Sequence, residues 1–240
     1  MRVLEAISDL RTAVPLAAVV KKCGLSPSQT HRYLASLAET GMVKQHSNGT
    51  YDLGPSSLKL GLSALARIDA YTIADEQISA FCKATGSTVL LAALGPAGPT
   101  IVRWHIGRPP IVTALAVGSI MSILHSATGQ VFLTFRPESE VEALVEEELT
   151  RGTDIDRDRI ETIKSQVRHA GVAAVGGSLI PGLNAWAYPI FDLQGHAILV
   201  ATVVTTSRDT QVLASHDDRL RDVCRSISQV LGFRPSNEVA

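Results

Sequence analysis

The sequence lacks the long apolar segments that would carry it into or across a membrane. Its 240 residues contain no run of about 20 apolar residues, the length that a helix needs to span a bilayer. The N-terminus also lacks the basic start and apolar core of a secretory signal peptide. A hydrophobic content of 45% is nevertheless ample for a buried core. We therefore expect a folded, cytoplasmic protein that has no membrane partner.

Cysteine is scarce and poorly spaced for cross-links or metals. Cys23, Cys82 and Cys224 are odd in number, far apart, and not part of a CxxC motif. This spacing indicates neither a disulfide framework nor a zinc site. We expect three buried thiols, no metal and no other cofactor.

The motifs of common catalytic sites are also missing. No GxSxG nucleophile elbow and no paired acid accompanies His105 or His125, so a general-base role for either histidine has little support. The glycine-rich segment 171–178 lacks the lysine of a phosphate-binding loop and follows a predicted helix instead of a strand. Six glutamates in 138–148 resemble a solvated helix face. We therefore expect that the protein is not an enzyme and has no catalytic residues. The alternative of a hydrolase or transferase is supported only by the two isolated histidines.

The charge is nearly balanced, but its distribution along the chain is not. A net charge of −1 argues against a protein that coats nucleic acid. Residues 1–54, however, hold six Lys or Arg against four Asp or Glu, which gives +2 there and −3 in the remainder. This asymmetry has the right sign for an N-terminal module that faces phosphates.

A capped helix is predicted to begin at Pro27 and to end before Gly41. Ser26 is placed to be the N-cap, Pro27 suits the first helical position, and Gln29 completes a capping box. One face of this helix is polar and rich in hydrogen-bond donors. It consists of Ser28, Gln29, Arg32 and Ser36. Such a face suits a DNA major groove, although this helix alone leaves an ordinary solvated face as the alternative.

The rest of the N-terminal region completes a small helical module. Helices are predicted at 2–10 and from Pro15 to just before Gly24, and strands at 42–45 and 50–53 joined by an Asn-Gly turn. A further helix at 56–70 has apolar residues too broadly spread for a surface helix with nothing against it, which indicates burial in a partner subunit. We therefore expect a DNA-binding domain at 1–54, a linker helix at 55–71 and a second domain at 72–240.

The second domain alternates between helical and extended patterns. Its predicted helices are 72–85, 122–135, 138–149, 156–170 and 216–231, and its predicted strands are 87–94, 100–106, 111–116, 172–175, 184–191 and 196–204. Turn-forming segments between successive strands indicate hairpins. This pattern is typical of an α+β domain with a largely antiparallel sheet.

Short segments along nearly the whole chain resemble the IclR family of bacterial transcriptional regulators. They are 2–7, 24–26, 31–34, 41–43, 51–54, 117–119, 127–129, 171–173 and 182–192. The resemblance implies a winged helix-turn-helix domain, a linker helix and a GAF-like effector-binding domain. It also implies a homodimer or homotetramer that binds double-stranded operator DNA and responds to a small-molecule effector, often an organic acid.

The same resemblance implies which residues contact DNA, and the chain differs from the family pattern at two places. The polar face described above, Ser28, Gln29, Arg32 and Ser36, would face DNA, with Lys44 in the wing and Asn48 at its tip. Pro27 stands where the family has Lys or Arg, and Met1 directly precedes Arg2, so the start of the first helix looks clipped. These departures keep open a small-molecule-binding module that has lost DNA binding.

An effector site is expected in the second domain. Gly118, Ser119, Ile120 and Met121 precede a predicted helix whose free N–H groups would bind a carboxylate, unless this is a plain strand-to-helix turn. On the sheet, Asn184, Trp186, Thr202 and Val204 would line a cavity, unless Trp186 belongs to the core.

The family often has Cys where Ala185 stands, and an acidic pair near Gly177 and Ser178. Their loss makes the expected pocket less polar on that side. We therefore expect an apolar or aromatic acid as the effector.

Overall fold

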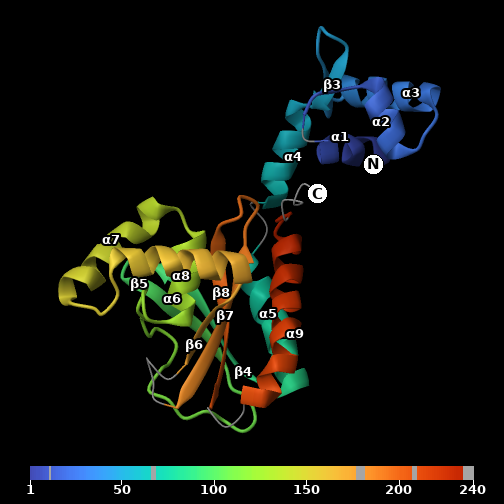
Figure 1. Ribbon diagram of the computed structural model, residues 1–240. Coiled ribbons are helices and arrows are strands. Elements are labelled where there is room, and N and C mark those ends of the chain that lie inside the picture. Colours follow the sequence, from blue (N-terminus) through green and yellow to red (C-terminus); the bar gives the residue numbers. More distant parts are fainter. Residues whose placement is uncertain (11, 66–68, 177–181, 207–209, 235–240) are drawn as a thin grey trace. The chain divides into compact units, whose positions relative to one another are not determined.

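The computed structural model describes residues 1–234 except 11, 66–68, 177–181 and 207–209. The chain divides into two compact units, Met1–Ile68 and Asp69–Ala240 (Figure 1). The boundary falls within the segment expected to be a linker helix.

The N-terminal unit consists of helices packed beside a three-stranded antiparallel sheet. The helices are α1 (Arg2–Leu10), α2 (Leu16–Cys23), α3 (Pro27–Glu39) and α4 (Pro55–Leu65). The strands are β1 (Val14–Pro15), β2 (Val43–Gln45) and β3 (Thr50–Leu53), in the order β1-β3-β2. The helices and the two-stranded wing were expected. Strand β1 was not expected, and Pro15 both ends this strand and is the N-cap of α2, which begins at Leu16.

Apolar residues at helical spacing make the core of this unit. Val3 and Ile7 of α1, Val19 of α2 and Leu34 of α3 are almost completely buried. Full burial of an aliphatic side chain contributes about 1.5–3 kcal/mol relative to exposure. The unit therefore has a small core of its own, which fixes the polar face of α3 outward.

The C-terminal unit is built on a five-stranded antiparallel sheet. Its strands are β4 (Thr88–Gly95), β5 (Gly98–His105), β6 (Ala173–Gly176), β7 (Leu183–Phe191) and β8 (Ala197–Thr206), in the order β5-β4-β8-β7-β6. Strands β4 and β5 form one hairpin, and β7 and β8 form another. The α+β class and the antiparallel sheet are confirmed.

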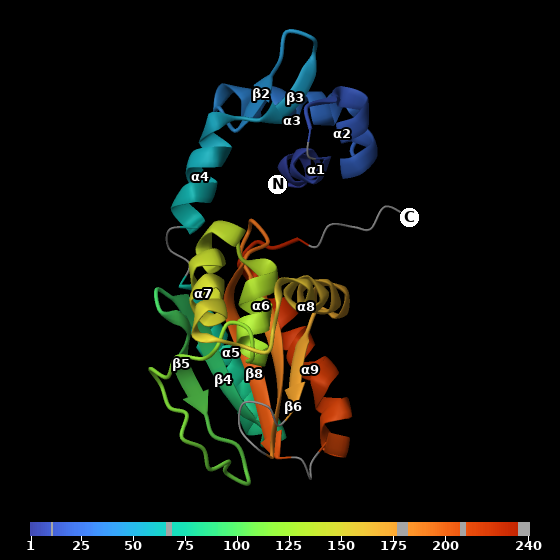
Figure 2. The same ribbon diagram turned by 60° about the vertical axis from the view of Figure 1, so that its left-hand side comes forward.

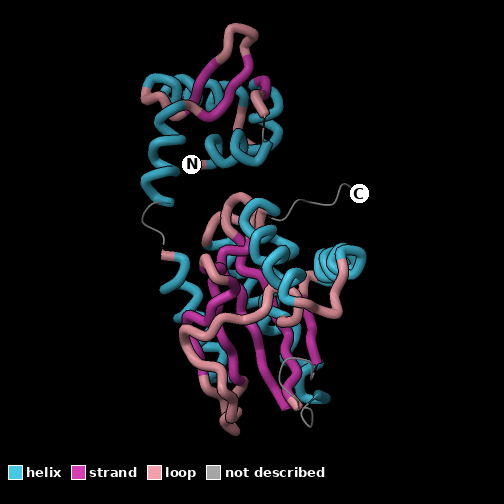
Figure 3. Tube along the Cα trace, turned by 90° about the vertical axis from the view of Figure 1, so that its left-hand side faces the viewer, coloured by secondary structure: helices cyan, strands magenta, loops and turns pink. Residues whose placement is uncertain are grey.

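Helices cover both faces of this sheet, as Figures 2 and 3 show. One face carries α6 (Ala127–Phe135), α7 (Glu138–Arg151) and α8 (Arg157–Ala170), and the other carries α5 (Ala70–Thr85) and α9 (Thr210–Val230). Successive residues of a strand point to opposite faces. Leu90 therefore joins the core beneath α6, whereas Val89 and Leu91 join the core beneath α5 and α9.

Three predictions about these elements are wrong. Segment 111–116 is not a strand, and its Val112 is 94% exposed, because this stretch has no neighbouring strand to pair with in the described part of the chain. The helix expected at 122–135 begins only at Ala127. The helix expected at 56–70 is described over Pro55–Leu65 and does not continue through Asp69, which is the N-cap of a new helix that begins at Ala70.

Candidate functional site

Helix α3 presents the polar face that the sequence indicates. Its cap has the expected geometry, since the Gln29 N–H donates to Ser26 Oγ at 3.3 Å and the Ser26 N–H donates to Gln29 Oε1 at 3.4 Å. The buried residues Thr30 and Leu34 are each 0% exposed. The outward residues are Ser28, Gln29, Arg32 and Ser36, all of them exposed.

Its role in the cap limits what the Gln29 side chain can offer to DNA. Gln29 Oε1 also accepts from Ser26 Oγ at 3.0 Å, so the Gln29 amide keeps its NH₂ group as the donor for an outside partner. Arg32 lies with its guanidinium 5.9 Å from the ring centroid of Tyr33. Tyr33 is 47% exposed and was not among the expected site residues. An aromatic residue beside an arginine on an otherwise polar helix was the signal that could have indicated it.

The wing is a short hairpin of β2 and β3. Lys44 is exposed in β2 and lies opposite Asp52 of β3. Asn48 Oδ1 accepts from the Thr50 N–H at 3.1 Å and from the Thr50 hydroxyl at 2.7 Å. Gly49 has φ of +80°, a conformation that glycine adopts without strain. Asn48 thus builds the turn with its side-chain oxygen, and its NH₂ group remains a donor at the tip.

A cavity of about 50 Å³ lies between the sheet and the start of α6 in the C-terminal unit. Its described wall is almost entirely apolar and holds no charged side chain. Thr128 Oγ1 and Thr202 Oγ1 share a hydrogen bond of 2.8 Å on this wall. The lining residues are Leu90, Leu115, Met121, Ser126, Ala127, Thr128, Val175, Leu183, Ala185, Thr202 and Val204.

The cavity includes some of the expected effector residues and not others. Met121, Thr202 and Val204 line it, whereas Asn184 and Trp186 do not. Trp186 packs against the core on the α5 and α9 side, and its neighbour Ala185 faces the cavity. The alternation along β7 was correctly recognised, but the sheet is covered on both faces, so alternation alone could not say which set faces the cavity.

Three of the four backbone N–H groups in the segment from Gly118 to Met121 are already hydrogen-bonded within the chain. The N–H groups of Gly118, Ser119 and Met121 donate to backbone carbonyls 2.8–2.9 Å away. Ile120 is 56% exposed and forms an isolated bridge to Thr100. The premise of a helix beginning here is therefore wrong. Gly177 and Ser178, expected to make the pocket less polar, lie outside the described residues.

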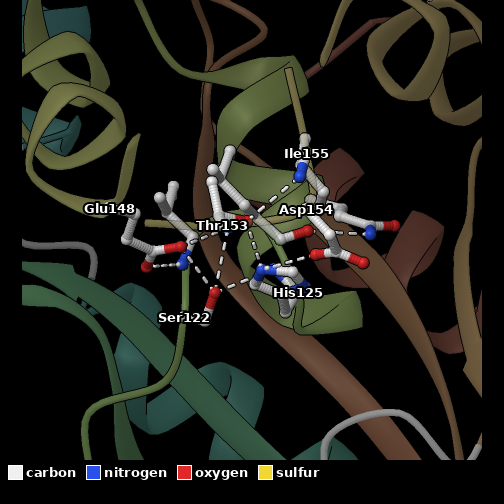
Figure 4. A network of polar contacts seen from close by, with 9 residues as sticks. Ser122, His125, Glu148, Thr153, Asp154 and Ile155 are labelled. Carbon is white, nitrogen blue, oxygen red and sulfur yellow. Dashed lines mark hydrogen bonds and ion pairs between the residues drawn. The ribbon is translucent and has the colours of Figure 1, made fainter. Parts of the chain in front are cut away.

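The loop before α6 donates its hydrogen bonds to a carboxylate of the protein itself, that of Glu148 (Figure 4). Glu148, at the end of α7, accepts from Ser122 Oγ at 2.6 Å, from the Ile123 N–H at 2.7 Å and from the Leu124 N–H at 3.2 Å. Met121 and Ser126, at the two ends of this loop, both line the cavity. The expectation of a solvated face is therefore wrong for Glu148, which fixes one wall of the cavity.

The two histidines weighed as catalytic bases lie apart from this cavity. His125 Nε2 is 2.7 Å from Thr153 Oγ1 and 3.6 Å from Asp154 (Figure 4). His105 Nε2 is 3.0 Å from a carboxylate oxygen of Asp75 on α5. These contacts join each histidine to a neighbouring element of the same unit.

Three further properties of the described residues bear on function. Among them, no three His, Cys, Asp or Glu side chains are grouped so that they could hold a metal ion. Burial raises the pKa of the Cys82 thiol to about 12 and also raises the pKa of Cys224. No helix in the described part is long and apolar enough to cross a membrane.

Comparison with known proteins gives concordant matches along the chain. The family model for the IclR helix-turn-helix domain matches residues 1–47, and the model for the C-terminal domain of the bacterial transcriptional regulator IclR matches residues 62–229. The HTH-type transcriptional regulator XynR of Escherichia coli K12 is 24% identical, covering 97% of this chain and 95% of the relative. The DNA-binding transcriptional repressor YiaJ of the same organism is 25% identical, covering 97% and 86%.

Solved structures agree with the sequence matches. Pseudomonas aeruginosa HmgR superposes with a TM-score of 0.86 at 31% identity and covers 98% of this chain and 97% of its own. The Agobacterium tumefaciens repressor BlcR superposes with a TM-score of 0.75 at 19% identity, covering 97% and 95%. The second likeness bears on the fold alone.

Proposed function

This chain belongs to the IclR family of bacterial transcriptional regulators, and from that premise we propose how it binds DNA and what it senses. The family supplies a helix-turn-helix DNA-binding domain and a C-terminal effector-binding domain. We propose that α3 and the β2–β3 wing bind double-stranded operator DNA. A small apolar or aromatic acid bound in the C-terminal unit then changes the affinity for that DNA.

The exposed polar face of α3 is the observation that carries the DNA-binding proposal. An arginine can donate two hydrogen bonds to a guanine edge in the major groove, and serine hydroxyls can bind bases or phosphates. Arg32 is the strongest base-reading candidate on this face, and Ser28, Gln29 and Ser36 flank it. Lys44 and Asn48 would contact the backbone from the wing.

The matching experiment measures binding to the upstream region of the protein's own gene by fluorescence anisotropy over a range of salt concentrations. Arg32→Ala should weaken specific binding by about 1–3 kcal/mol and relax base preference. Lys44→Ala should weaken binding to all sequences and reduce the salt slope by about 1. Lys83→Ala, an exposed lysine of the C-terminal unit, is the charge-matched control.

The outcome also separates the proposal from its alternative. If the chain binds no DNA specifically but still binds a small molecule, the alternative of a ligand-binding module without DNA binding is favoured. Pro27 is the residue that favours this alternative, because a phosphate-binding cation would otherwise stand at the start of α3. If Arg32→Ala leaves both affinity and base preference unchanged, α3 is not the reading helix.

The cavity beneath α6 is the proposed place of the effector. Its apolar wall suits an apolar or aromatic body, and the hydroxyls of Thr128 and Thr202 could hydrogen-bond a polar group. A thermal-shift screen of aromatic and short organic acids tests this, since a ligand that binds the folded state raises the melting temperature by mass action. Thr202→Val should reduce the shift given by a true effector, and an unchanged shift would place that effector elsewhere.

Self-association through α4 is proposed from its exposed apolar residues. Leu58 is 65% exposed and Leu60 is 59% exposed, which is unusual for two leucines so close together on a short helix. A dimer would present two α3 helices to half-sites about 34 Å apart, and the effector would act by favouring one arrangement of the pair. Light scattering should show weaker self-association for Leu58→Ser than for Lys59→Ser, and equal masses would exclude this surface.

A further inference from the structure

A second cavity lies at the β6 edge of the sheet, between α8 and α9. Strand β6 pairs with β7 only from Asn184 to Ala187. From Tyr188 to Phe191, no described strand pairs with this edge of β7. Figure 2 shows α8 and α9 on opposite faces of the sheet at this edge. The hollow between them has a volume of about 360 Å³, and we call it the α8–α9 cavity.

The α8–α9 cavity is lined by positive charge. Arg168 of α8 and Arg221 and Arg225 of α9 contribute to its wall, and the described lining residues include no Asp or Glu. Arg168 donates to the Thr134 carbonyl at 3.3 Å. Arg225 pairs with Asp222 at 3.2 Å in a largely exposed contact, and exposed ion pairs are weak enough to exchange partners. The cavity is therefore suited to an anion.

Tyr188, which lines the same cavity, has a buried hydroxyl without a hydrogen-bond partner among the described residues. Tyr188 is 1% exposed. The guanidinium of Arg221 lies 5.8 Å from the centre of its ring. Buried polar groups are nearly always hydrogen-bonded, so an unpartnered hydroxyl on a residue that lines the cavity points to a ligand as the partner.

Three phenylalanine rings form another part of the wall. The Phe191 and Phe233 centroids are 4.6 Å apart with planes tilted by 31°. Phe135 meets Phe191 edge to face at 5.1 Å. Rings in such arrangements present faces and edges against which a further ring can pack. The ligand should therefore carry an aromatic body as well as a negative charge.

We infer that the α8–α9 cavity is a second ligand site, which binds an aromatic carboxylate. The carboxylate accepts hydrogen bonds from Arg168, Arg225 and the Tyr188 hydroxyl, and the ring packs against Phe191 and Phe233. This site shares no lining residue with the cavity beneath α6, whose described wall has no charge. It does not depend on whether the protein binds DNA or on what the first cavity holds.

Calorimetric titration of the full chain with phenylacetate tests the inference, and phenylacetamide serves as the uncharged counterpart. Arg168→Gln and Arg225→Gln should each weaken phenylacetate binding about tenfold, since hydrogen bonds to charged groups contribute more than neutral ones. Arg159→Gln is the matched control, because Arg159 is exposed on the same helix α8 and does not line the cavity. Phenylacetamide should bind at least tenfold more weakly than phenylacetate.

Tyr188→Phe keeps the inference testable if an arginine variant folds poorly. Removal of an unpartnered hydroxyl should leave the melting temperature of the unliganded chain unchanged or higher, while phenylacetate binding weakens. Three results would overturn the inference. They are undetectable phenylacetate binding at millimolar concentration, equal affinity for phenylacetate and phenylacetamide, and binding that Thr202→Val abolishes while the arginine variants retain it.

Discussion

Substitution of Glu148 by alanine tests whether an internal carboxylate holds the wall of the first cavity. The carboxylate accepts one hydrogen bond from Ser122 Oγ and two from the N–H groups of Ile123 and Leu124, residues that are 1% and 0% exposed. Leu124 keeps an alternative acceptor, Ser122 Oγ at 3.2 Å. The Ile123 N–H has none among the described contacts and would be left unpaired in a buried place.

The expected magnitude follows from these contacts. An unsatisfied buried donor costs about 1–3 kcal/mol, and a hydrogen bond to a charged group contributes about 1.5–3 kcal/mol. Since the loop can relax and admit water, we expect Glu148→Ala to lower the free energy of unfolding by about 3 kcal/mol. For a domain of this size that corresponds to a fall in melting temperature of roughly 6–12 °C.

The neighbouring Glu147 gives a matched control. It forms an exposed i,i+4 pair with Arg151, and such pairs contribute about 0.3–0.5 kcal/mol. Urea denaturation followed by circular dichroism would measure both variants. Equal losses of stability for Glu147→Ala and Glu148→Ala would refute the reasoning, because the N–H groups of the loop would then have found other acceptors.

Two further predictions concern buried polar groups of the C-terminal unit. Thr128→Val and Thr202→Val should each lower the free energy of unfolding by about 1–2 kcal/mol. The double variant should lose less than the sum of the two, because it leaves no unpaired hydroxyl. Additive losses in urea denaturation would contradict this prediction. A thiol reagent at pH 8 should modify the half-buried Cys23 long before Cys82 and Cys224. Burial disfavours the thiolate, and with a pKa of about 12 only about one Cys82 in ten thousand is ionised at that pH; similar labelling rates in mass spectra would argue against this burial.

The N-terminal unit could be predicted closely because its signals are local. Ser26, Pro27 and Gln29 form a capping box whose hydrogen bonds lie within four residues, and Gly49 supplies the turn of the wing. The outward face of α3 follows from the same helical period that buries Thr30 and Leu34. Strand β1 was missed because two residues, one of them Pro15, carry no periodicity.

The C-terminal site could be predicted only in part because it depends on contacts distant in sequence. The alternation of β7 was visible, but the choice between Ala185 and Trp186 as the cavity residue depends on which helices cover each face. The loop before α6 looked like a helix start because its acceptor, Glu148, comes more than 20 residues later. The α8–α9 cavity was not foreseen at all, since its arginines come from two helices that the sequence does not bring together.

The glycine at position 129 is explained by the close approach of the loop before α6. A helix-interior glycine normally costs about 0.5–1 kcal/mol relative to alanine, yet a Cβ at Gly129 would lie 2.1 Å from the Ser122 carbonyl oxygen. Gly129→Ala should therefore push the loop away from α6, destabilise the unit by at least about 1–3 kcal/mol and weaken ligand binding in the cavity beneath α6. Gly61→Ala, at an exposed helix position with nothing within 4 Å, should instead stabilise the chain by about 0.5–1 kcal/mol. Chemical denaturation of the two variants should thus give changes of opposite sign, and a stabilising Gly129→Ala would mean that the loop does not lie against α6.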